Sequence, residues 1–167
     1  ETLAMEFAPL AKSKQLAFTI ENQADEIVSG DKNRILSIGG NLLSNAIKFT
    51  QSGTIILCTD YKNDVFTLSV SDTGTGMTKE QQQRIFTPFE RLGNAVTEDG
   101  FGLGLAIVAD MVKLLKGSIA VESEPGKGSR FTVSLPLPKA EEAITGEKKQ
   151  DSHVSLSSCN ILAIDND

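Results

Sequence analysis

The sequence predicts an α/β (α+β) two-layer sandwich, in which a mixed sheet of about five strands packs on about three helices. Short segments with apolar residues at every second position are interspersed with longer segments in which apolar residues recur every three or four positions. Glycine, asparagine and aspartate separate many of these segments, as turns require. A length of 167 residues and an apolar content of 40% suit one domain with some remainder.

The first part of the chain is expected to form two helices with two short strands between them. Leu3, Phe7, Leu10 and Ala11 have helical spacing. Asp31 suits the N-cap of a long helix. The expected helices cover residues 1–15 and 31–50, and the expected strands cover residues 16–22 and 26–30.

The rest of the domain is expected to contain two hairpins and two helices. The first hairpin turns at Lys62, Asn63 and Asp64, and the second turns in the run EPGKGS. A short helix ends near Pro88, and a polar loop with glycines follows it. The expected bounds are residues 54–61, 65–72, 118–123 and 130–137 for the strands, 79–86 and 103–115 for the helices, and 91–102 for the loop.

The end of the chain changes in composition. Residues 16–137 are expected to form the domain core, and residues 138–158, rich in Glu, Lys and Ser, read as a flexible linker. Residues 159–167 turn apolar again and predict the truncated first strand of another domain. The chain does not begin with methionine, so we expect a piece of a longer protein.

Composition excludes several classes of function. The 16 basic and 22 acidic residues give a net charge of −6, which argues against a nucleic-acid-binding surface. No apolar run approaches the roughly 20 residues that cross a membrane, and no signal peptide is visible. Cys58 is expected in the core, Cys58 and Cys159 match no metal or redox spacing, and the single histidine, His153, lies in a polar region.

A polar stripe is predicted on the long helix. Asn41, Asn45 and Lys48 share one face, while an apolar stripe about a third of a turn away is expected to pack on the sheet. Asparagine oxygens suit Mg²⁺, and a lysine can neutralise phosphate charge. An amphipathic helix with a solvated polar face explains the same pattern. The apolar stripe comprises Ile35, Leu42, Ala46 and Phe49.

An aspartate ends the strand of residues 65–72 in the register of its apolar residues. Phe66, Leu68 and Val70 share one face, so Asp72 is expected to point to the buried side. A buried carboxylate needs a hydrogen-bond donor, and a ligand amine such as that of adenine would be one. Asp72 could equally cap its own turn, in which Gly74 and Gly76 would allow close approach of a flat ligand.

A glycine-rich turn precedes the helix of residues 103–115. It contains Gly100, Gly102 and Gly104, and free N–H groups at a helix start attract phosphate. It matches neither the P-loop nor the dinucleotide fingerprint, and a flexible loop would give the same glycines. The preceding loop of residues 91–102 is long enough to predict a flexible lid over a nucleotide.

Taken together, five segments resemble the motifs of the ATP-binding catalytic domain of sensor histidine kinases, which is related to gyrase and Hsp90-type ATPases. The resemblance covers residues 1–137. NLLSNAIKF (41–49) is similar to the N box, DTGTGM (72–77) to the first glycine box and FTPFERL (86–92) to the F box. GFGLGL (100–105) is similar to the second glycine box, and GKGSRFTVSLPL (126–137) to the motif of the last strand.

The resemblance implies a site for ATP and Mg²⁺. By it Asn45 would bind Mg²⁺, Asn41 and Lys48 would serve the phosphates, and Asp72 would hold the adenine amine. Arg91 would reach the terminal phosphate, so that Asn41, Lys48 and Arg91 form the implied catalytic set, and Ser129 would join a water network around Asp72. The other implied nucleotide-binding residues are Gly74, Gly76, Met77, Phe86, Gly100, Gly102, Leu103, Gly104 and Leu105.

The resemblance also implies a reaction. Related ATPases that use water as the acceptor carry a glutamate where this chain has Asn41, and asparagine cannot take a proton at physiological pH. This favours transfer of the γ-phosphate to a histidine on a separate domain. A protein-serine kinase and a non-catalytic nucleotide-binding module are the alternatives, and His153 matches no acceptor motif.

Further expectations concern the whole protein. Residues 1–15 would end a helical linker from a preceding histidine-bearing dimerisation domain, and residues 159–167 would begin a receiver domain in which Asn166 follows Asp165 in place of a second acid. A response regulator is the implied partner, with no nucleic acid. The full-length protein would be a cytoplasmic homodimer, as part of a membrane-anchored sensor, and the fragment is compatible with a monomer.

Overall fold

The computed structural model describes residues 2–24, 27–89 and 103–140, and the backbone of residues 154–155. Its elements follow the order that the sequence predicts, with one short strand, β7, that was not expected. They are α1 (Thr2–Ser13), β1 (Ala17–Asn22), β2 (Ile27–Val28), α2 (Lys32–Phe49), β3 (Thr54–Lys62), β4 (Val65–Asp72), α3 (Lys79–Arg84), α4 (Gly104–Leu114), β5 (Ser118–Glu124), β6 (Gly128–Pro136) and β7 (Val154–Ser155).

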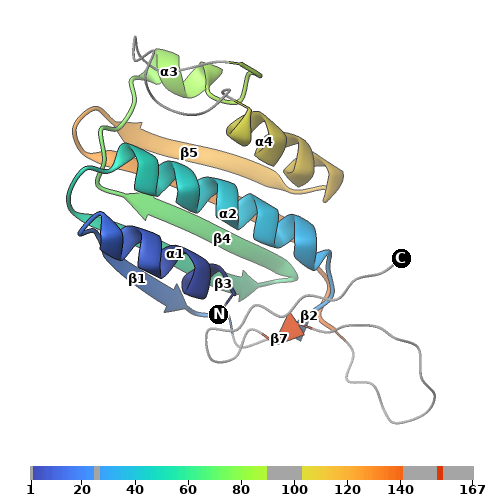
Figure 1. Ribbon diagram of the computed structural model, residues 1–167. Coiled ribbons are helices and arrows are strands. Elements are labelled where there is room, and N and C mark those ends of the chain that lie inside the picture. The colour runs from blue at the N-terminus through green and yellow to red at the C-terminus, as the bar shows by residue number, and fades with distance from the viewer. Residues whose placement is uncertain (1, 25–26, 90–102, 141–153, 156–167) are drawn as a thin grey trace, which may run out of the picture.

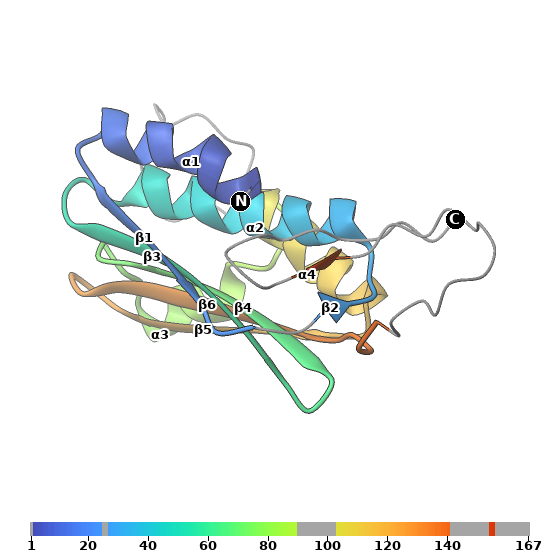
Figure 2. The same ribbon diagram turned by 90° about the horizontal axis from the view of Figure 1, so that it is seen from below.

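The domain has two layers (Figure 1). One layer is a five-stranded sheet in the order β1-β3-β4-β6-β5, in which β1 runs parallel to β3 and the other neighbours are antiparallel. The other layer consists of α1, α2 and α4 on a single face of this sheet (Figure 2), while α3 contacts β5. This confirms the predicted two-layer α/β sandwich with a mixed sheet.

The core lies between the helices and the centre of the sheet. Phe66, Leu68 and Val70 on β4 are each 1% exposed, and Leu42 on α2 is fully buried. Each such side chain contributes about 1.5–3 kcal/mol through burial of apolar surface. Alternation along β4 therefore fixes which of its faces meets the helices.

Helix α2 connects two neighbouring parallel strands, because β1 precedes it and β3 follows it. Asp31 is its N-cap, as predicted, and accepts a hydrogen bond from the N–H of Arg34 at 3.0 Å. The helix ends at Phe49, where the N–H of Thr50 still bonds the carbonyl of Ala46 at 3.1 Å. Both ends of α2 are thus set by local hydrogen bonds.

The strand predicted at residues 26–30 is present as the shorter β2 (Ile27–Val28). It does not join the main sheet but pairs with β7, and Val28 forms a bridge with Lys139. The N–H of Ser29 also bonds the carbonyl of Pro138 at 2.9 Å. A strand of two residues with only one buried side chain, Val28, adds too little to extend the sheet. The start of the predicted linker is therefore held against β2, while its residues 141–153 and 156–158 lie outside the described part.

The sequence predicts a linker helix over residues 1–15 and a separate domain from residue 16. Among the described residues, both parts contribute to one hydrophobic core. Leu3, Phe7 and Ala11 on α1 are buried in the same cluster as Ile38 and Leu43 on α2. Helix α1 is therefore part of the sandwich. The wider domain divisions, including residues 159–167, stay predictions.

Cys58 is not in the core. Ile55, Leu57 and Thr59 occupy the core-facing register of β3, so Cys58 is half-buried on the outer face of the sheet. The apolar Ile56 beside it hides this alternation in the sequence. Burial raises the pKa of the Cys58 thiol, and the Glu21 carboxylate adds to the rise. Within the described ranges, no helix has the length and apolarity to cross a membrane.

Two adjacent glycines inside α2 have different packing. A Cβ at Gly39 would lie 2.5 Å from Cδ1 of Leu3, whereas a Cβ at Gly40 would lie 3.7 Å from the ring of Phe7, an ordinary contact. Gly39 therefore allows α1 to approach α2, and Gly40 has no such role.

We expect Gly40→Ala to raise the free energy of unfolding by about 0.5–1 kcal/mol, because alanine restricts the unfolded chain and favours the helix. The matched variant Gly39→Ala should not gain stability, because Leu3 must move to make room for the methyl group. Urea denaturation of both variants measures the difference. Equal gains at the two positions would contradict the packing described for Leu3.

Candidate functional site

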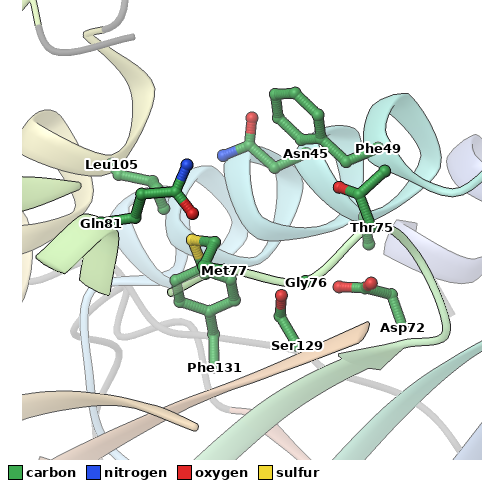
Figure 3. Close-up of a pocket in the computed structure, with 11 residues that line it drawn as sticks. Asn45, Phe49, Asp72, Thr75, Gly76, Met77, Gln81, Leu105, Ser129 and Phe131 are labelled. Carbon is green, nitrogen blue, oxygen red and sulfur yellow. The ribbon is translucent and has the colours of Figure 1, made fainter. Parts of the chain in front are cut away.

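A cavity of about 240 Å³ opens at one end of the sandwich. It lies between the last turns of α2, the end of β4 with the turn after it, and the starts of α4 and β6 (Figure 3). Its walls combine apolar side chains with a few polar groups, as ligand pockets commonly do. The lining residues are Asn45, Ala46, Phe49, Asp72, Thr75, Gly76, Met77, Gln81, Leu105, Ser129 and Phe131.

Asp72 is half-buried at the end of β4 and lines the cavity, as its register predicts. Its Oδ1 accepts the N–H of Gly74 at 2.8 Å, so the side chain also caps its own turn. Burial raises the pKa of the Asp72 carboxyl, while hydrogen bonds from the backbone of Gly74 and Ser129 oppose the rise. An ionised carboxylate here accepts hydrogen bonds and would favour a ligand that donates an N–H.

The turn after Asp72 requires glycine at two positions. A Cβ at Gly74 would lie 2.4 Å from the carbonyl oxygen of Phe49. Gly76 has a φ of +63°, and a Cβ there would lie 1.8 Å from the carbonyl oxygen of Glu124. The turn therefore fits closely between the end of α2 and the β5–β6 hairpin, and its backbone forms part of the cavity wall.

The polar stripe of α2 reaches the cavity only in part. Asn45 lines it, whereas Asn41 lines a separate groove between α1 and α2 and donates from Nδ2 to the carbonyl of Ser37 at 2.8 Å. Both asparagines face the start of α4, because a Cβ at Gly104 would lie 3.0 Å from Oδ1 of Asn41 and 4.0 Å from Nδ2 of Asn45. The amides and the first turn of α4 thus share one region.

Phe49 corrects one expectation. It was assigned to the apolar stripe that packs on the sheet, but it is 40% exposed and lines the cavity. The last turn of α2 meets the turn after β4, where the N–H of Thr75 bonds the carbonyl of Phe49 at 3.3 Å, and the Phe49 side chain lies at the cavity. The Nζ atom of Lys48 lies 5.4 Å from the centroid of the Phe49 ring, a cation–π distance.

The other predicted site residues divide into three groups. Met77, Leu105 and Ser129 line the cavity together with Gly76. Leu103 and Gly104 begin α4, and Phe86 packs against the hydrophobic core without lining the cavity. Arg91, Gly100 and Gly102 lie outside the described residues, as does the expected lid.

Several residues at the site were not predicted. Phe131 pairs with Val70 on the core-facing side of the sheet, so its register could have indicated it. Gln81 forms a capping box with Thr78 at the start of α3, a signature visible in the sequence. Ala46, Phe49 and Thr75 lie inside the segments 41–49 and 72–77, so their membership of these motifs was the signal that could have indicated them.

Comparison with known proteins identifies the fold and the family. The family model described as histidine kinase-, DNA gyrase B- and HSP90-like ATPase matches residues 30–139. Sensor histidine kinase RcsC of Escherichia coli is 37% identical over an alignment of 167 positions. This alignment covers 93% of this chain and 18% of RcsC. Sensor protein GacS of Pseudomonas syringae is 35% identical over an alignment of 158 positions, which covers 89% of this chain and 17% of GacS. The chain thus spans less than a fifth of these relatives.

Solved structures of histidine kinases have a similar fold. Full-length ShkA in complex with AMPPNP matches with a TM-score of 0.74 and 30% identity, over 84% of this chain and 30% of ShkA. The nucleotide-free catalytic domain of histidine kinase ThkA matches with a TM-score of 0.70 and 26% identity, over 81% of this chain and 88% of that domain. The family suggested by the five motifs is confirmed: the chain belongs to the histidine kinase-, DNA gyrase B- and HSP90-like ATPases.

Proposed function

We propose that this domain binds ATP with Mg²⁺ and transfers the γ-phosphoryl group to a histidine on a separate domain, in two-component signalling. The observation that carries the proposal is one cavity that joins the half-buried carboxylate of Asp72 to the amide of Asn45. The similarity to sensor histidine kinases such as RcsC supports it.

The base would occupy the Asp72 end of the cavity. Its exocyclic amine would donate to the Asp72 carboxylate, and Met77, Leu105 and Phe131 supply apolar walls for a flat ring. The close fit of Gly76 against Glu124 leaves the backbone of the turn within reach of the base. The similar ShkA structure holds AMPPNP, an adenine nucleotide analogue, which supports an adenine nucleotide as the ligand.

The phosphates would lie toward α4. Helix N-termini attract anions, and α4 begins at Gly104 beside Asn41 and Asn45. The donor set fits Mg²⁺, because Asn45 offers an amide oxygen and Mg²⁺ takes its other ligands from phosphate and water. Asn41 and Lys48 would serve the phosphates. When bound, Mg²⁺ would neutralise phosphate charge during transfer.

Asn41 would decide the acceptor. An amide does not act as a general base, so the site has poor means to activate water at this position. Transfer would instead depend on positioning an acceptor against the phosphate. Arg91, Gly100 and Gly102 are proposed to contact the phosphates from the segment outside the described residues.

The proposal extends to the rest of the protein. The chain covers 18% of RcsC, so the proposal includes domains that are not part of this chain. We infer a preceding histidine-bearing dimerisation domain, a following receiver domain and a response regulator as partners. The parent would be a homodimer, with this domain on the cytoplasmic side of the membrane.

A transfer assay tests the function. Incubation with ATP, Mg²⁺ and a separately produced histidine-bearing domain is expected to give acid-labile, base-stable phosphate on that domain. The same domain with its acceptor histidine replaced should stay unlabelled. Phosphate on serine would favour a protein-serine kinase instead, and nucleotide binding without any transfer would favour a non-catalytic module.

A further inference from the structure

A buried hydroxyl lies directly behind the cavity. Ser123 on β5 follows Ile119 and Val121 in the core-facing register and is 8% exposed. It does not line the cavity, yet its neighbours on β6 and on the turn after β4 do. Serine at a core-facing position is costly unless hydrogen-bonded, so its partners are informative.

Three groups contact the Ser123 hydroxyl. Its oxygen accepts the N–H of Met77 at 2.8 Å, and the hydroxyl donates to the carbonyl of Gly128 at 2.9 Å. The Oγ atom of Ser129 lies 3.0 Å away, and geometry allows either hydroxyl to donate in this pair. Ser123 therefore connects two lining residues, Met77 and Ser129.

Counting protons decides the direction of the bond between the two serines. A serine hydroxyl has one proton and two lone pairs. If Ser123 donates to Gly128, its lone pairs accept from Met77 and from Ser129, and all three contacts are hydrogen bonds. If Ser123 donates to Ser129, the contact with Gly128 has no proton. The first arrangement keeps the whole network satisfied, as buried polar groups require.

The consequence is that Ser129 presents lone pairs to the cavity. Its own proton is used toward Ser123, so its oxygen can only accept. Ser129 pairs with Asp72 across β4 and β6, and both side chains line the cavity (Figure 3). Two adjacent acceptors match an exocyclic amine, which has two N–H donors, and oppose a carbonyl oxygen at the same position.

The backbone of Met77 has a hydrogen-bond partner at its N–H and another at its carbonyl. Ser123 accepts its N–H, while Nε2 of Gln82 donates to its carbonyl at 3.0 Å and to the carbonyl of Ser123 at 2.8 Å. Met77 is buried and forms part of the cavity wall. The network thus fixes the apolar wall and the acceptor pair together.

Resting on the proposed binding of ATP, we propose that Ser123 is a positioning residue that makes Ser129 an acceptor beside Asp72 and thereby selects 6-aminopurine over 6-oxopurine nucleotides. Ser123 acts through Ser129 and need not touch the base.

Binding of three triphosphates by calorimetry tests the proposal: ATP, inosine triphosphate with a 6-oxo group, and purine riboside triphosphate with neither substituent. Wild type is expected to bind inosine triphosphate most weakly. In Ser123→Ala the Ser129 hydroxyl loses its acceptor on Ser123, so it can turn toward the cavity and donate a hydrogen bond to the 6-oxo group. The preference for ATP over inosine triphosphate should fall by at least about tenfold. Ser118→Ala, an exposed serine on the same strand, should keep the wild-type preference.

The outcomes separate this inference from the proposed function. If wild type binds no triphosphate, the proposed function fails. If wild type binds ATP but Ser123→Ala weakens all three nucleotides equally, Ser123 is only a structural support and this inference fails. If Ser123→Ala does not fold, Ser123→Cys replaces it, because a thiol fills the space but is a weak donor and acceptor. An unchanged preference in that variant overturns the proposal.

Discussion

Replacing Asp72 with asparagine is expected to weaken ATP binding by roughly a hundredfold or more while the domain stays folded. The Asp72 carboxylate faces the cavity as an acceptor, and asparagine places N–H donors where the base amine would donate. The amide oxygen can still accept the N–H of Gly74, which bonds Oδ1 at 2.8 Å in the wild type. The loss should therefore appear in binding and not in the fold.

The same substitution should change how stability depends on pH. Burial raises the pKa of Asp72 in the folded state, so ionisation of this carboxyl disfavours folding as pH rises through the raised value. Asparagine removes that cost. The quantity to compare is the free energy of unfolding of Asp72→Asn minus that of wild type. This difference should be larger at neutral pH than at a pH below the usual pKa of aspartate. ATP binding by wild type should weaken as Asp72 protonates, at a higher pH than for an ordinary aspartate.

Calorimetric titration with ATP and chemical denaturation across pH measure both effects. Asp110→Asn, an exposed aspartate on α4, serves as the matched control and should behave as wild type in both assays. Near-normal ATP affinity in Asp72→Asn would remove this residue from the base site.

Asn45→Ala is expected to abolish the Mg²⁺ dependence of nucleotide binding. Asn45 lines the cavity near the start of α4, and its amide oxygen is the proposed ligand. Without it, ATP affinity at saturating Mg²⁺ should fall by about tenfold or more, toward the value without metal. Alanine favours the helix, so α2 should remain intact.

The measurement is ATP affinity as a function of Mg²⁺ concentration, with folding checked by circular dichroism. Asn33→Ala changes an exposed asparagine near the other end of the same helix and should leave the titration unchanged. An Mg²⁺ titration of Asn45→Ala that overlays the wild type would refute the ligand role.

The sequence predicted best where one local rule was decisive. The alternation of β4 placed Asp72 correctly, and Asp31 marked the start of α2 because an N-cap uses only nearby residues. Cys58 was misplaced because Ile56 makes both faces of β3 look apolar. The position of Phe49 depended on how the last turn of α2 meets the turn after β4 and the cavity, which no helical pattern contains.

The polar network shows a different limit. Ser123 could have been noticed as a serine in a core-facing register, as Asp72 was. Its partners Met77, Gly128 and Ser129 come from two other parts of the chain, and their distances depend on how the turn after β4 meets the β5–β6 hairpin. The register of a strand indicates that a polar group is buried, but not what it bonds.

The position of α2 between two parallel neighbouring strands has a consequence for the order of folding. Ala17 on β1 pairs with Thr54 on β3, far along the chain, whereas β3 and β4 form a local hairpin. Closing a long loop costs more entropy than closing a short one, so the β3–β4 hairpin that carries Asp72 is expected to form more readily than the β1–β3 pairing across α2. A nucleotide that needs both residues would bind only to the completed fold and stabilise it by about 2.7 kcal/mol at a hundred times its dissociation constant. Ligand occupancy would then report that α2 and the β3–β4 hairpin are assembled together.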